Sequence, residues 1–314
     1  MRDYMVFGGR LRLPLVLAGL RPLAPDGVAD WRLRVAGSPP APAPGAPAAE
    51  WSDGDLHIRL TRLSSGWRLA YDDTGTYDVS AEGARWTWHP GPAAPRELVQ
   101  ADLLGRVLAL ALSARGALPL HGAAVTAAGR GLVLLGAKHA GKSTLAGALV
   151  AGGARLVADD MAVVDGGDVP RLRPGAPLLR LWNEAADHLR AAGLGGVRIH
   201  GTKQTLANLP AERVEPRATP LDAIYLLDAP LAADGPPVLR TPLSPRDAVV
   251  AMLTHAKLGP LLHGPLAATH LARAAAVAAR VPVYALRVAP GFGRLAEVAT
   301  ALLSMHTPAA RAAA

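Results

Sequence analysis

One short segment constrains the fold of this 314-residue chain more than any other. The apolar run 132–135 leads directly into a loop, 136–141, that begins and ends with glycine and has four residues between the two glycines. Lys142, Ser143 and Thr144 follow, and from about Lys142 to residue 150 the sequence is typical of a helix. A buried strand, a tight loop and a helix in this order predict an α/β core with a central sheet.

The residues of this loop match the Walker A pattern of two spaced glycines followed by lysine and a hydroxyl residue. Glycines let successive backbone N–H groups turn toward phosphate oxygens, and the start of a helix adds partial positive charge. In this pattern Lys142 reaches the β- and γ-phosphates, and the Ser143 hydroxyl binds Mg²⁺. We therefore predict ATP and Mg²⁺ as cofactors, with the nucleotide held by Gly136, Ala137, Lys138, His139, Ala140, Gly141, Lys142, Ser143 and Thr144.

Two adjacent carboxylates, Asp159 and Asp160, follow the predicted strand 154–158. Ligands of open α/β sheets bind at the carboxyl ends of the strands, so we expect this pair near the loop. One carboxylate would hold Mg²⁺ and the other would accept a proton from an attacking hydroxyl. We assign both to catalysis, and Asp160 with Ser143 to the metal, although the order of the two roles stays open. The alternative is an ordinary turn that begins with aspartate.

His121 leads the predicted strand 121–125, which a turn at 129–130 connects to the apolar run. A single histidine is more often packed or exposed than catalytic, so its position alone leaves both interpretations open.

The remaining sequence indicates two domains, a β-rich unit over 1–115 and an α/β domain over 116–314. Alternating polar and apolar patches separated by turn residues favour a small antiparallel β unit. We interpret its tryptophans as packing residues, and we predict a loop at 38–49 and a bridging helix at 97–112. In the second domain, strands are expected at 161–164, 223–227 and 281–288, and helices at 245–255, 266–279 and 295–304.

Composition excludes several functions. The chain has no cysteine, so disulfide scaffolds, thiol catalysis and cysteine-bound zinc are excluded. The net charge of +8 comes mostly from scattered arginines, and with 4% aromatic residues this disfavours a nucleic-acid partner. No apolar run approaches the roughly 18 residues of a membrane span, so we expect a cytoplasmic protein without a membrane partner. A homo-oligomer is compatible with the sequence.

Three motifs together resemble a known family. The tripeptide 120–122, the segment 136–144 and the run 155–160 are similar in order and spacing to the catalytic domain of HPr kinase/phosphorylase. They resemble more closely the HPr-kinase-related proteins of peptide-modification gene clusters. The segments 173–175, 177–182 and 281–286 also resemble those relatives. The resemblance covers about 118–304, and its specific motifs end near 205. At Thr144, HPr kinases place a glutamate, and their C-terminal dephosphorylation signature is not visible.

The resemblance implies a P-loop kinase core of the type shared with ATP-dependent phosphoenolpyruvate carboxykinase, transferring the γ-phosphate to serine. It implies that an aspartate of the pair is the base, that its neighbour and Ser143 lie near the metal, and that His121 lies close by, so we also assign His121 to catalysis. It also implies a nucleotide contact for Lys203.

The expected function is therefore an ATP-dependent serine kinase whose substrate is a peptide or small protein, such as the precursor of a ribosomal natural product. Two alternatives remain, a nucleotide-binding regulator without transferase activity and a small-molecule enzyme of the carboxykinase kind. Intact aspartates argue against the first, and the missing cluster of further His and Lys metal ligands argues against the second.

Overall fold

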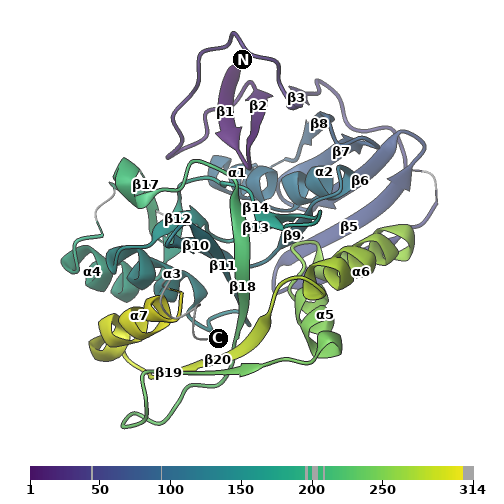
Figure 1. The fold of residues 1–314 in the computed structure, drawn as a ribbon. Helices are drawn as coiled ribbons and strands as arrows, with labels where there is room; N and C mark the ends of the chain where they lie inside the picture. Colours follow the sequence, from purple (N-terminus) through teal and green to yellow (C-terminus); the bar gives the residue numbers. More distant parts are fainter. Residues whose placement is uncertain (44, 93, 195–196, 200–203, 208, 307–314) are drawn as a thin grey trace. The chain divides into compact units, whose positions relative to one another are not determined.

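The protein is a mixed α/β chain made of two compact units (Figure 1). The computed structural model describes residues 1–314 apart from 44, 93, 195–196, 200–203, 208 and 307–314. The first unit comprises Met1–Pro119 with Ala256–Ala272, and the second comprises Leu120–His255 with Arg273–Ala314. Strand β9 (Leu118–Leu120) carries the chain from the first unit into the second. The expected division at 115 had assigned 256–272 to the second domain, whereas the contacts of this segment place it in the first unit.

The first unit is built on an eight-stranded sheet with the order β1-β2-β3-β8-β7-β6-β5-β4. Strands β4 to β8 form an antiparallel meander, and β3 pairs in parallel with both β2 and β8. The predicted alternating patches are confirmed as β5, β6 and β7. The strands are β1 (Arg2–Val6), β2 (Gly9–Leu13), β3 (Trp31–Val35), β4 (Ala49–Asp53), β5 (Leu56–Leu63), β6 (Gly66–Tyr71), β7 (Gly75–Ser80) and β8 (Arg85–Pro90).

Aromatic side chains fill the core of this unit, which confirms the packing role of four of its five tryptophans; Trp51 is only partly buried and lies under the Arg106 guanidinium. Trp31, Trp67, Trp86 and Trp88 are all at most 9% exposed. The Trp88 ring stacks on Tyr77 at a centroid distance of 6.1 Å, and its indole N–H donates to the Thr74 carbonyl. The Trp86 indole N–H donates to the Gly83 carbonyl in the same way, so the Trp86 and Trp88 rings are fixed in orientation as well as buried.

The predicted helix 97–112 is present but interrupted. It consists of α1 (Arg96–Asp102), a π-helical segment η1 (Leu103–Val107) and α2 (Leu108–Ala114). The interruption is centred on Gly105, whose φ of −97° and ψ of −112° are not helical. The absence of a Cβ at this residue allows the backbone to leave the regular path, which the hydrophobic spacing alone did not reveal.

The returning segment 256–272 is joined to the first unit by hydrogen bonds. The Lys257 N–H donates to the Pro119 carbonyl at 2.9 Å, and Ser113 Oγ lies 3.2 Å from Nε2 of the buried His270. This segment contains the short helix η3 (Gly259–Leu261) and most of helix α6 (Gly264–Ala278). Its hydrogen-bond partners are Ser113 on α2 and Pro119 on β9, so residues far along the chain complete the first unit.

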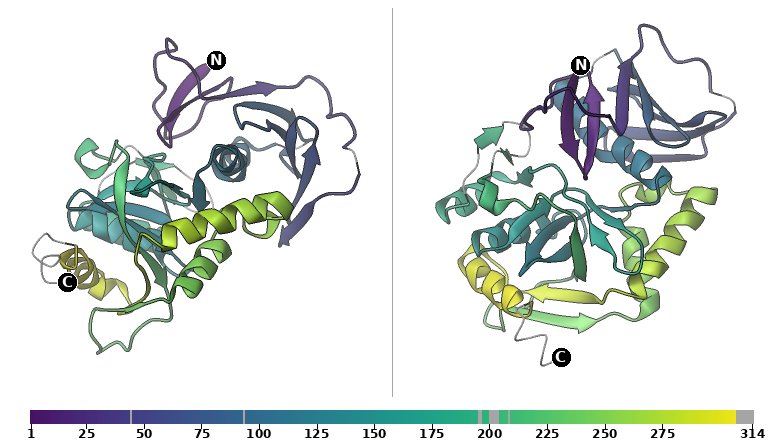
Figure 2. Two further views of the ribbon diagram at one scale, coloured as in Figure 1. Left: turned by 45° about the vertical axis from the view of Figure 1, so that its right-hand side comes forward. Right: turned by 45° about the horizontal axis from the view of Figure 1, so that its top comes forward.

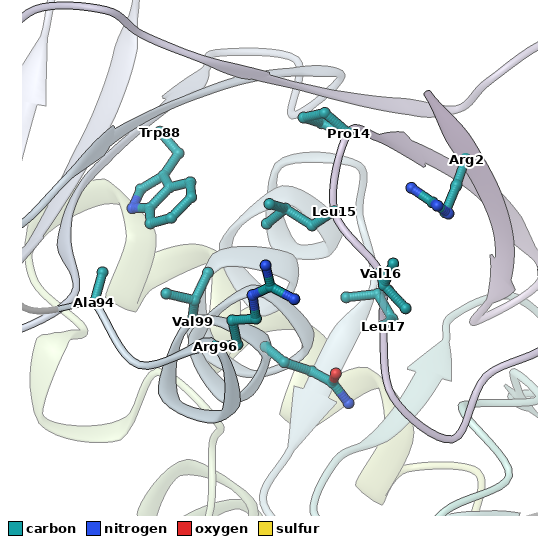
Figure 3. Close-up of a pocket in the computed structure, with 10 residues that line it drawn as sticks. Arg2, Pro14, Leu15, Val16, Leu17, Trp88, Ala94, Arg96 and Val99 are labelled. Atoms are coloured by element: carbon teal, nitrogen blue, oxygen red, sulfur yellow. The ribbon is translucent and has the colours of Figure 1, made fainter.

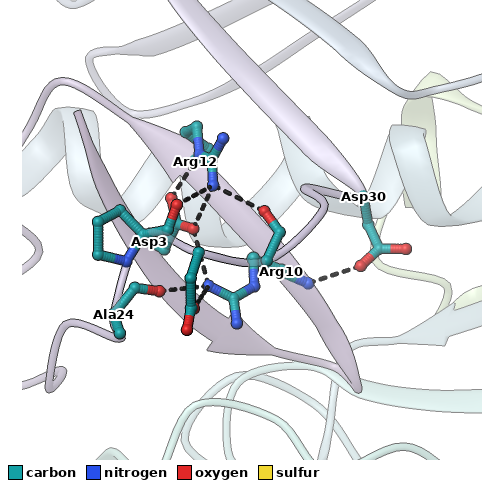
Figure 4. Close-up of polar contacts among 8 residues, drawn as sticks. Asp3, Arg10, Arg12, Ala24 and Asp30 are labelled. Carbon is teal, nitrogen blue, oxygen red and sulfur yellow. Dashed lines mark hydrogen bonds and ion pairs between the residues drawn. The ribbon is translucent and has the colours of Figure 1, made fainter.

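A buried carboxylate holds the first two strands together (Figure 4). The Asp3 side chain is fully buried and accepts hydrogen bonds from Arg12 at 2.7 Å and from Arg10 at 2.9 Å. The hydrogen bond from Arg12 holds the pKa of Asp3 well below its ordinary value, although burial acts in the opposite direction. Arg10 and Arg12 also donate to carbonyl oxygens of the segment 24–27, which ties this loop to the strands.

The second unit contains a mixed sheet with the order β12-β10-β11-β18-β14-β13, and β18 also pairs with β20, which pairs with β19. A smaller sheet has the order β15-β17-β16. The strands are β10 (Ala123–Ala127), β11 (Arg130–Leu135), β12 (Arg155–Ala158), β13 (Ala162–Asp165), β14 (Arg171–Leu172), β15 (Leu179–Leu181), β16 (Val197–Ile199), β17 (Gln204–Ala207), β18 (Thr219–Leu227), β19 (Val238–Pro242) and β20 (Val283–Val288). The expected strands of this domain are confirmed with small changes at their ends.

Three helices pack against one another in the core of the second unit (Figure 2). Helix α3 (Lys142–Ala151) contacts both α4 (Asn183–Ala191) and α7 (Leu295–Ser304). Their buried side chains, such as Leu149, Leu189 and Leu302, share one hydrophobic cluster. The remaining helices are α5 (Pro245–Thr254), η2 (Ala211–Arg213) and η4 (Phe292–Arg294).

Helix α5 begins where its sequence predicts. Ser244 Oγ accepts the N–H of Asp247 and so caps the helix, and Pro245 occupies its first position. No helix in the described part of the chain combines the length and the apolar character needed to cross a bilayer.

Strand direction determines where the loops of the second unit meet. Strand β11 runs parallel to β18, and β10 lies between β11 and β12, antiparallel to both. The carboxyl ends of β11 and β12 therefore lie at the same edge as the beginning of β10. This edge brings residue 121, the loop 136–141 and the aspartate pair together.

We expect Asp3→Asn to lower the thermal midpoint of the full-length protein, because two guanidinium groups lose their shared carboxylate. A carboxyl whose native pKa is depressed stabilises the fold above its unfolded pKa, about 3.9, and this stabilisation is lost as the pH falls below that value. Thermal unfolding between pH 3 and pH 7 should therefore show a smaller pH dependence for Asp3→Asn than for the wild type. Asp26→Asn is the control, because Asp26 is 80% exposed and 3.9 Å from Arg10; an equal effect of both substitutions would contradict this prediction.

Candidate functional site

The loop 136–141 joins the end of β11 to the first residue of α3. The backbone conformation and the packing of the loop require glycine at both of its ends. Gly141 has a φ of +87°, in the left-handed region, and a Cβ on Gly136 would lie 3.1 Å from the Leu227 side chain and 3.2 Å from that of Ala140. The spacing seen in the sequence therefore has a steric cause, since larger residues at either position would strain or displace the loop.

Lys142 folds back over this loop from the first position of α3. Its Nζ donates to the carbonyl oxygens of Gly136 and Ala137, each at 2.9 Å, and the residue is only 9% exposed. Two backbone carbonyl oxygens thus help to hold the ammonium group at the mouth of the loop. An anion placed there would gain a charge-assisted contact.

Asp159 lies directly beside the loop, as predicted. Its Oδ1 accepts a hydrogen bond from Ser143 Oγ at 2.8 Å, and its Oδ2 accepts one from the Arg180 backbone N–H at 2.8 Å. Burial raises the pKa of Asp159, and the neighbouring charge of Asp160 raises it further against the effect of these two hydrogen bonds. The structure confirms the proximity of the pair to the loop, while the roles of its members stay predictions.

Asp160 faces different partners. Its carboxylate lies 3.4 Å from His121 Nδ1 and 3.4 Å from Arg180 Nη1, and His121 Nδ1 is also 3.1 Å from the Asp160 carbonyl oxygen. Its φ of +68° is uncommon for a residue other than glycine. This conformation separates the two carboxylates, so that one is partly exposed between His121 and Arg180 and the other turns toward Ser143.

Two residues near the pair were not identified as site residues from the sequence. Arg180, on β15, contacts both aspartates through its backbone and its guanidinium. His255 follows α5 and accepts the His121 N–H with its carbonyl oxygen at 2.6 Å. Burial, followed by the charges of Lys142 and His121, lowers the pKa of His255 to about 4, so its imidazole is neutral at pH 7. Arg180 lies within the segment 177–182, whose similarity to the HPr-kinase-related proteins did not indicate a role for this side chain, whereas His255 lies in no recognised motif.

An aromatic pair stands next to the loop. The His139 ring stacks on Trp182 with a centroid distance of 5.4 Å and an interplanar angle of 21°. Trp182 precedes α4 and is 48% exposed, so its ring is an apolar surface open to solvent. The stacking fixes where the His139 ring lies, and the predicted nucleotide contact of this loop residue stays a prediction.

The other predicted residues are placed as follows. Ala137 and Lys138 are exposed on the loop, Ala140 is partly buried within it, and Thr144 is partly buried in the first turn of α3. Lys203 lies outside the described residues. The structure therefore brings together His121, the loop, Ser143 and both aspartates.

The oxygen atoms of Ser143 and Asp159 suit a hard cation such as Mg²⁺, which is usually bound by one or two protein carboxylates together with water and phosphate oxygens. The sequence had paired Ser143 with Asp160 at the metal, whereas the carboxylate found in hydrogen-bond contact with Ser143 is Asp159. Within the described residues, no group of three or more His, Cys, Asp or Glu side chains is arranged to hold a metal ion.

These observations define a mixed α/β protein with a glycine-bounded loop and two carboxylates at one edge of its sheet. No protein-family model matches the chain, and no curated protein does either. Among solved structures, the chain is similar to the Hpr(Ser) kinase/phosphatase from Coxiella burnetii, with 14% sequence identity and a TM-score of 0.32. The match covers 60% of this chain and 99% of that one. The functional inference therefore rests on the geometry of the side chains.

We expect Lys142→Met to raise the pKa of His255 from about 4 toward, but not up to, its ordinary value of 6.5, because burial remains after the charge is removed. Histidine NMR titrations of the wild type and the variant would measure the change. His306 is the internal control, because burial and Arg240 lower its pKa to about 4 without a contribution from Lys142. A pKa of His255 that is the same in both proteins would show that its imidazole does not sense the Lys142 charge.

Proposed function

We propose that this protein is an ATP-dependent kinase that transfers the γ-phosphate to a serine hydroxyl of a peptide or small protein. The observation that carries the proposal is the hydrogen bond between Ser143 and Asp159 beside the Lys142 ammonium, with a second carboxylate on the same turn. A single carboxylate near a basic loop would suit binding alone. Two carboxylates with different surroundings suit both metal binding and proton transfer.

The loop 136–141 and the start of α3 would hold the triphosphate. Backbone N–H groups at a helix start attract anions, and the Lys142 ammonium would move its contacts from the Gly136 and Ala137 carbonyls to phosphate oxygens. This exchange replaces neutral acceptors with charged ones, so it favours the bound state.

Ser143 and Asp159 would hold Mg²⁺, which neutralises charge on the phosphates when it is bound. The Ser143 hydroxyl would then direct a lone pair rather than its proton toward the site. Binding of the cation would also favour the ionised form of Asp159, whose pKa is otherwise raised by burial.

Asp160 would act as the base. As the serine oxygen bonds to the γ-phosphorus, the bond from that phosphorus to the β–γ bridging oxygen breaks, the serine proton passes to the Asp160 carboxylate, and ADP leaves. His121 and Arg180 lie 3.4 Å from the two oxygens of this carboxylate and would hold its orientation. Removing such a base typically costs about 10²- to 10⁴-fold in rate.

The acceptor is inferred from two features. A serine acceptor and a peptide context follow from the resemblance of the motifs to HPr-kinase-related proteins. The exposed Trp182 ring, next to His139 of the loop, offers an apolar surface on which a peptide side chain could pack.

We expect Asp160→Asn to lower transfer of the γ-phosphate to serine peptides by at least about 100-fold while ATP still binds. We expect Lys142→Met to lose most ATP binding, because the ammonium contact to the phosphates is gone. Transfer would be measured with γ-labelled ATP and Mg²⁺ on degenerate peptide pools that carry serine, threonine or alanine at one fixed position. Binding would be measured by calorimetry.

Asp165→Asn is the matched control, since Asp165 lies at the end of β13 and forms an ion pair with Arg173, which directly follows β14. Its transfer rate should equal that of the wild type. Tight ATP binding without transfer to any pool would favour the nucleotide-binding regulator instead. Equal labelling by Asp160→Asn and the wild type would exclude Asp160 as the base.

A further inference from the structure

The first unit carries a pocket that lies wholly on its own residues (Figure 3). The pocket has a volume of about 230 Å³ and lies between the segment 14–17, the start of α1 and the Trp88 ring of β8. Small-molecule and cofactor pockets usually measure about 300–1,000 Å³, so this volume suits a single large side chain better than a whole cofactor. We call it the Trp88 pocket.

The walls of the Trp88 pocket are apolar and held in place. Leu17, Trp88 and Val99 line it and are 2%, 7% and 3% exposed, so each is fixed by the core behind it. The Leu17 N–H donates to the Tyr4 hydroxyl at 3.1 Å. The Gln100 side chain accepts the Ala18 N–H at 2.6 Å and donates to the Ala18 carbonyl at 3.0 Å. These bonds tie the segment 14–18 to β1 and α1, so the pocket is preformed.

Two guanidinium groups stand at the rim. Arg2 and Arg96 line the Trp88 pocket, both residues are exposed, and Figure 3 places them on either side of Val16 and Leu15. Neither has an ion-pair partner among the described residues. Elsewhere in this unit, arginines such as Arg10, Arg12 and Arg68 are paired with aspartates. The rim therefore carries positive charge that no acidic side chain in the described part of the chain neutralises.

An apolar pocket below two unpaired guanidinium groups is complementary to a ligand with one large apolar group and nearby carboxylates. A nucleic acid would bring phosphates but would need an exposed aromatic surface for its bases, and the Trp88 ring is almost fully buried. An extended peptide supplies both chemistries from neighbouring residues, because successive side chains along it can point into the pocket and toward its rim.

We propose that the Trp88 pocket binds an acidic segment of the peptide acceptor, with one large apolar side chain inside the pocket and carboxylates on Arg2 and Arg96. In naming the acceptor as the ligand, this inference rests on the proposed function. The binding itself requires neither nucleotide nor the carboxylate pair of the second unit. The first unit then selects the peptide, and the second unit transfers the phosphate. The affinity for the peptide falls as salt screens the charges of Arg2 and Arg96.

The test is peptide binding to the full-length protein without nucleotide. Fluorescence anisotropy would compare a fluorescein-labelled Gly-Leu-Gly-Glu-Glu-Gly peptide with two counterparts, one with serine in place of leucine and one with glutamine in place of both glutamates. We expect the parent peptide to bind at least tenfold more tightly than either counterpart at 50 mM salt. Its advantage over the glutamine peptide should shrink at 500 mM salt.

Substitutions at the rim assign this binding to the pocket. Arg2→Gln together with Arg96→Gln should weaken the parent peptide at least tenfold, and Val16→Asp should do the same by adding a negative charge at a residue that is 59% exposed. Arg32→Gln together with Arg34→Gln is the matched control, because both arginines are exposed on β3. These control substitutions should leave the affinity unchanged.

Equal affinity for all three peptides, or an affinity that the rim substitutions do not change, overturns the proposal. A single-stranded oligothymidine that binds as tightly as the parent peptide, and that the rim substitutions weaken equally, would overturn the peptide assignment as well. Selective binding that the rim substitutions weaken, in a protein that transfers no phosphate, would refute the proposed function and leave the Trp88 pocket as a peptide site.

Discussion

The site depends on the position of one strand. Strand β10 lies between β11 and β12 and runs opposite to both, so the chain must cross from β11 to β12 through α3. This arrangement brings the loop after β11, the aspartates after β12 and the residue before β10 to the same edge of the sheet. It also explains why Ser143, on the crossing helix, meets Asp159 at 2.8 Å although 15 residues separate them.

The two aspartates differ because their environments differ. The Asp159 carboxyl is surrounded by hydrogen-bond donors from Ser143 and Arg180, in a place where burial favours its neutral form. Asp160 keeps partial exposure and has cationic or polar neighbours at 3.4 Å on both oxygens. The left-handed backbone at Asp160 turns two identical side chains, adjacent in sequence, toward different surroundings.

Local patterns could predict much of the second unit but only part of the first. The loop, Lys142 and the aspartate pair were recognisable because the chemistry requires particular residues at short spacings. Arg180 and His255 reach the site through pairing between distant segments, which no short window contains. In the first unit, the helix 96–114 was recognisable by its apolar spacing, whereas its interruption at Gly105 depends on packing. The attachment of 256–272 likewise depends on tertiary contacts.

That attachment has a consequence for how the protein forms. Ser113 and Pro119 make hydrogen bonds with His270 and Lys257, which the ribosome adds 157 and 138 residues later, respectively. During synthesis at about 5–20 residues per second, the N-terminal sheet therefore waits several seconds or longer for the segment that completes it. About three quarters of the second unit, but not β20 or α7, is therefore synthesised before the first unit is complete.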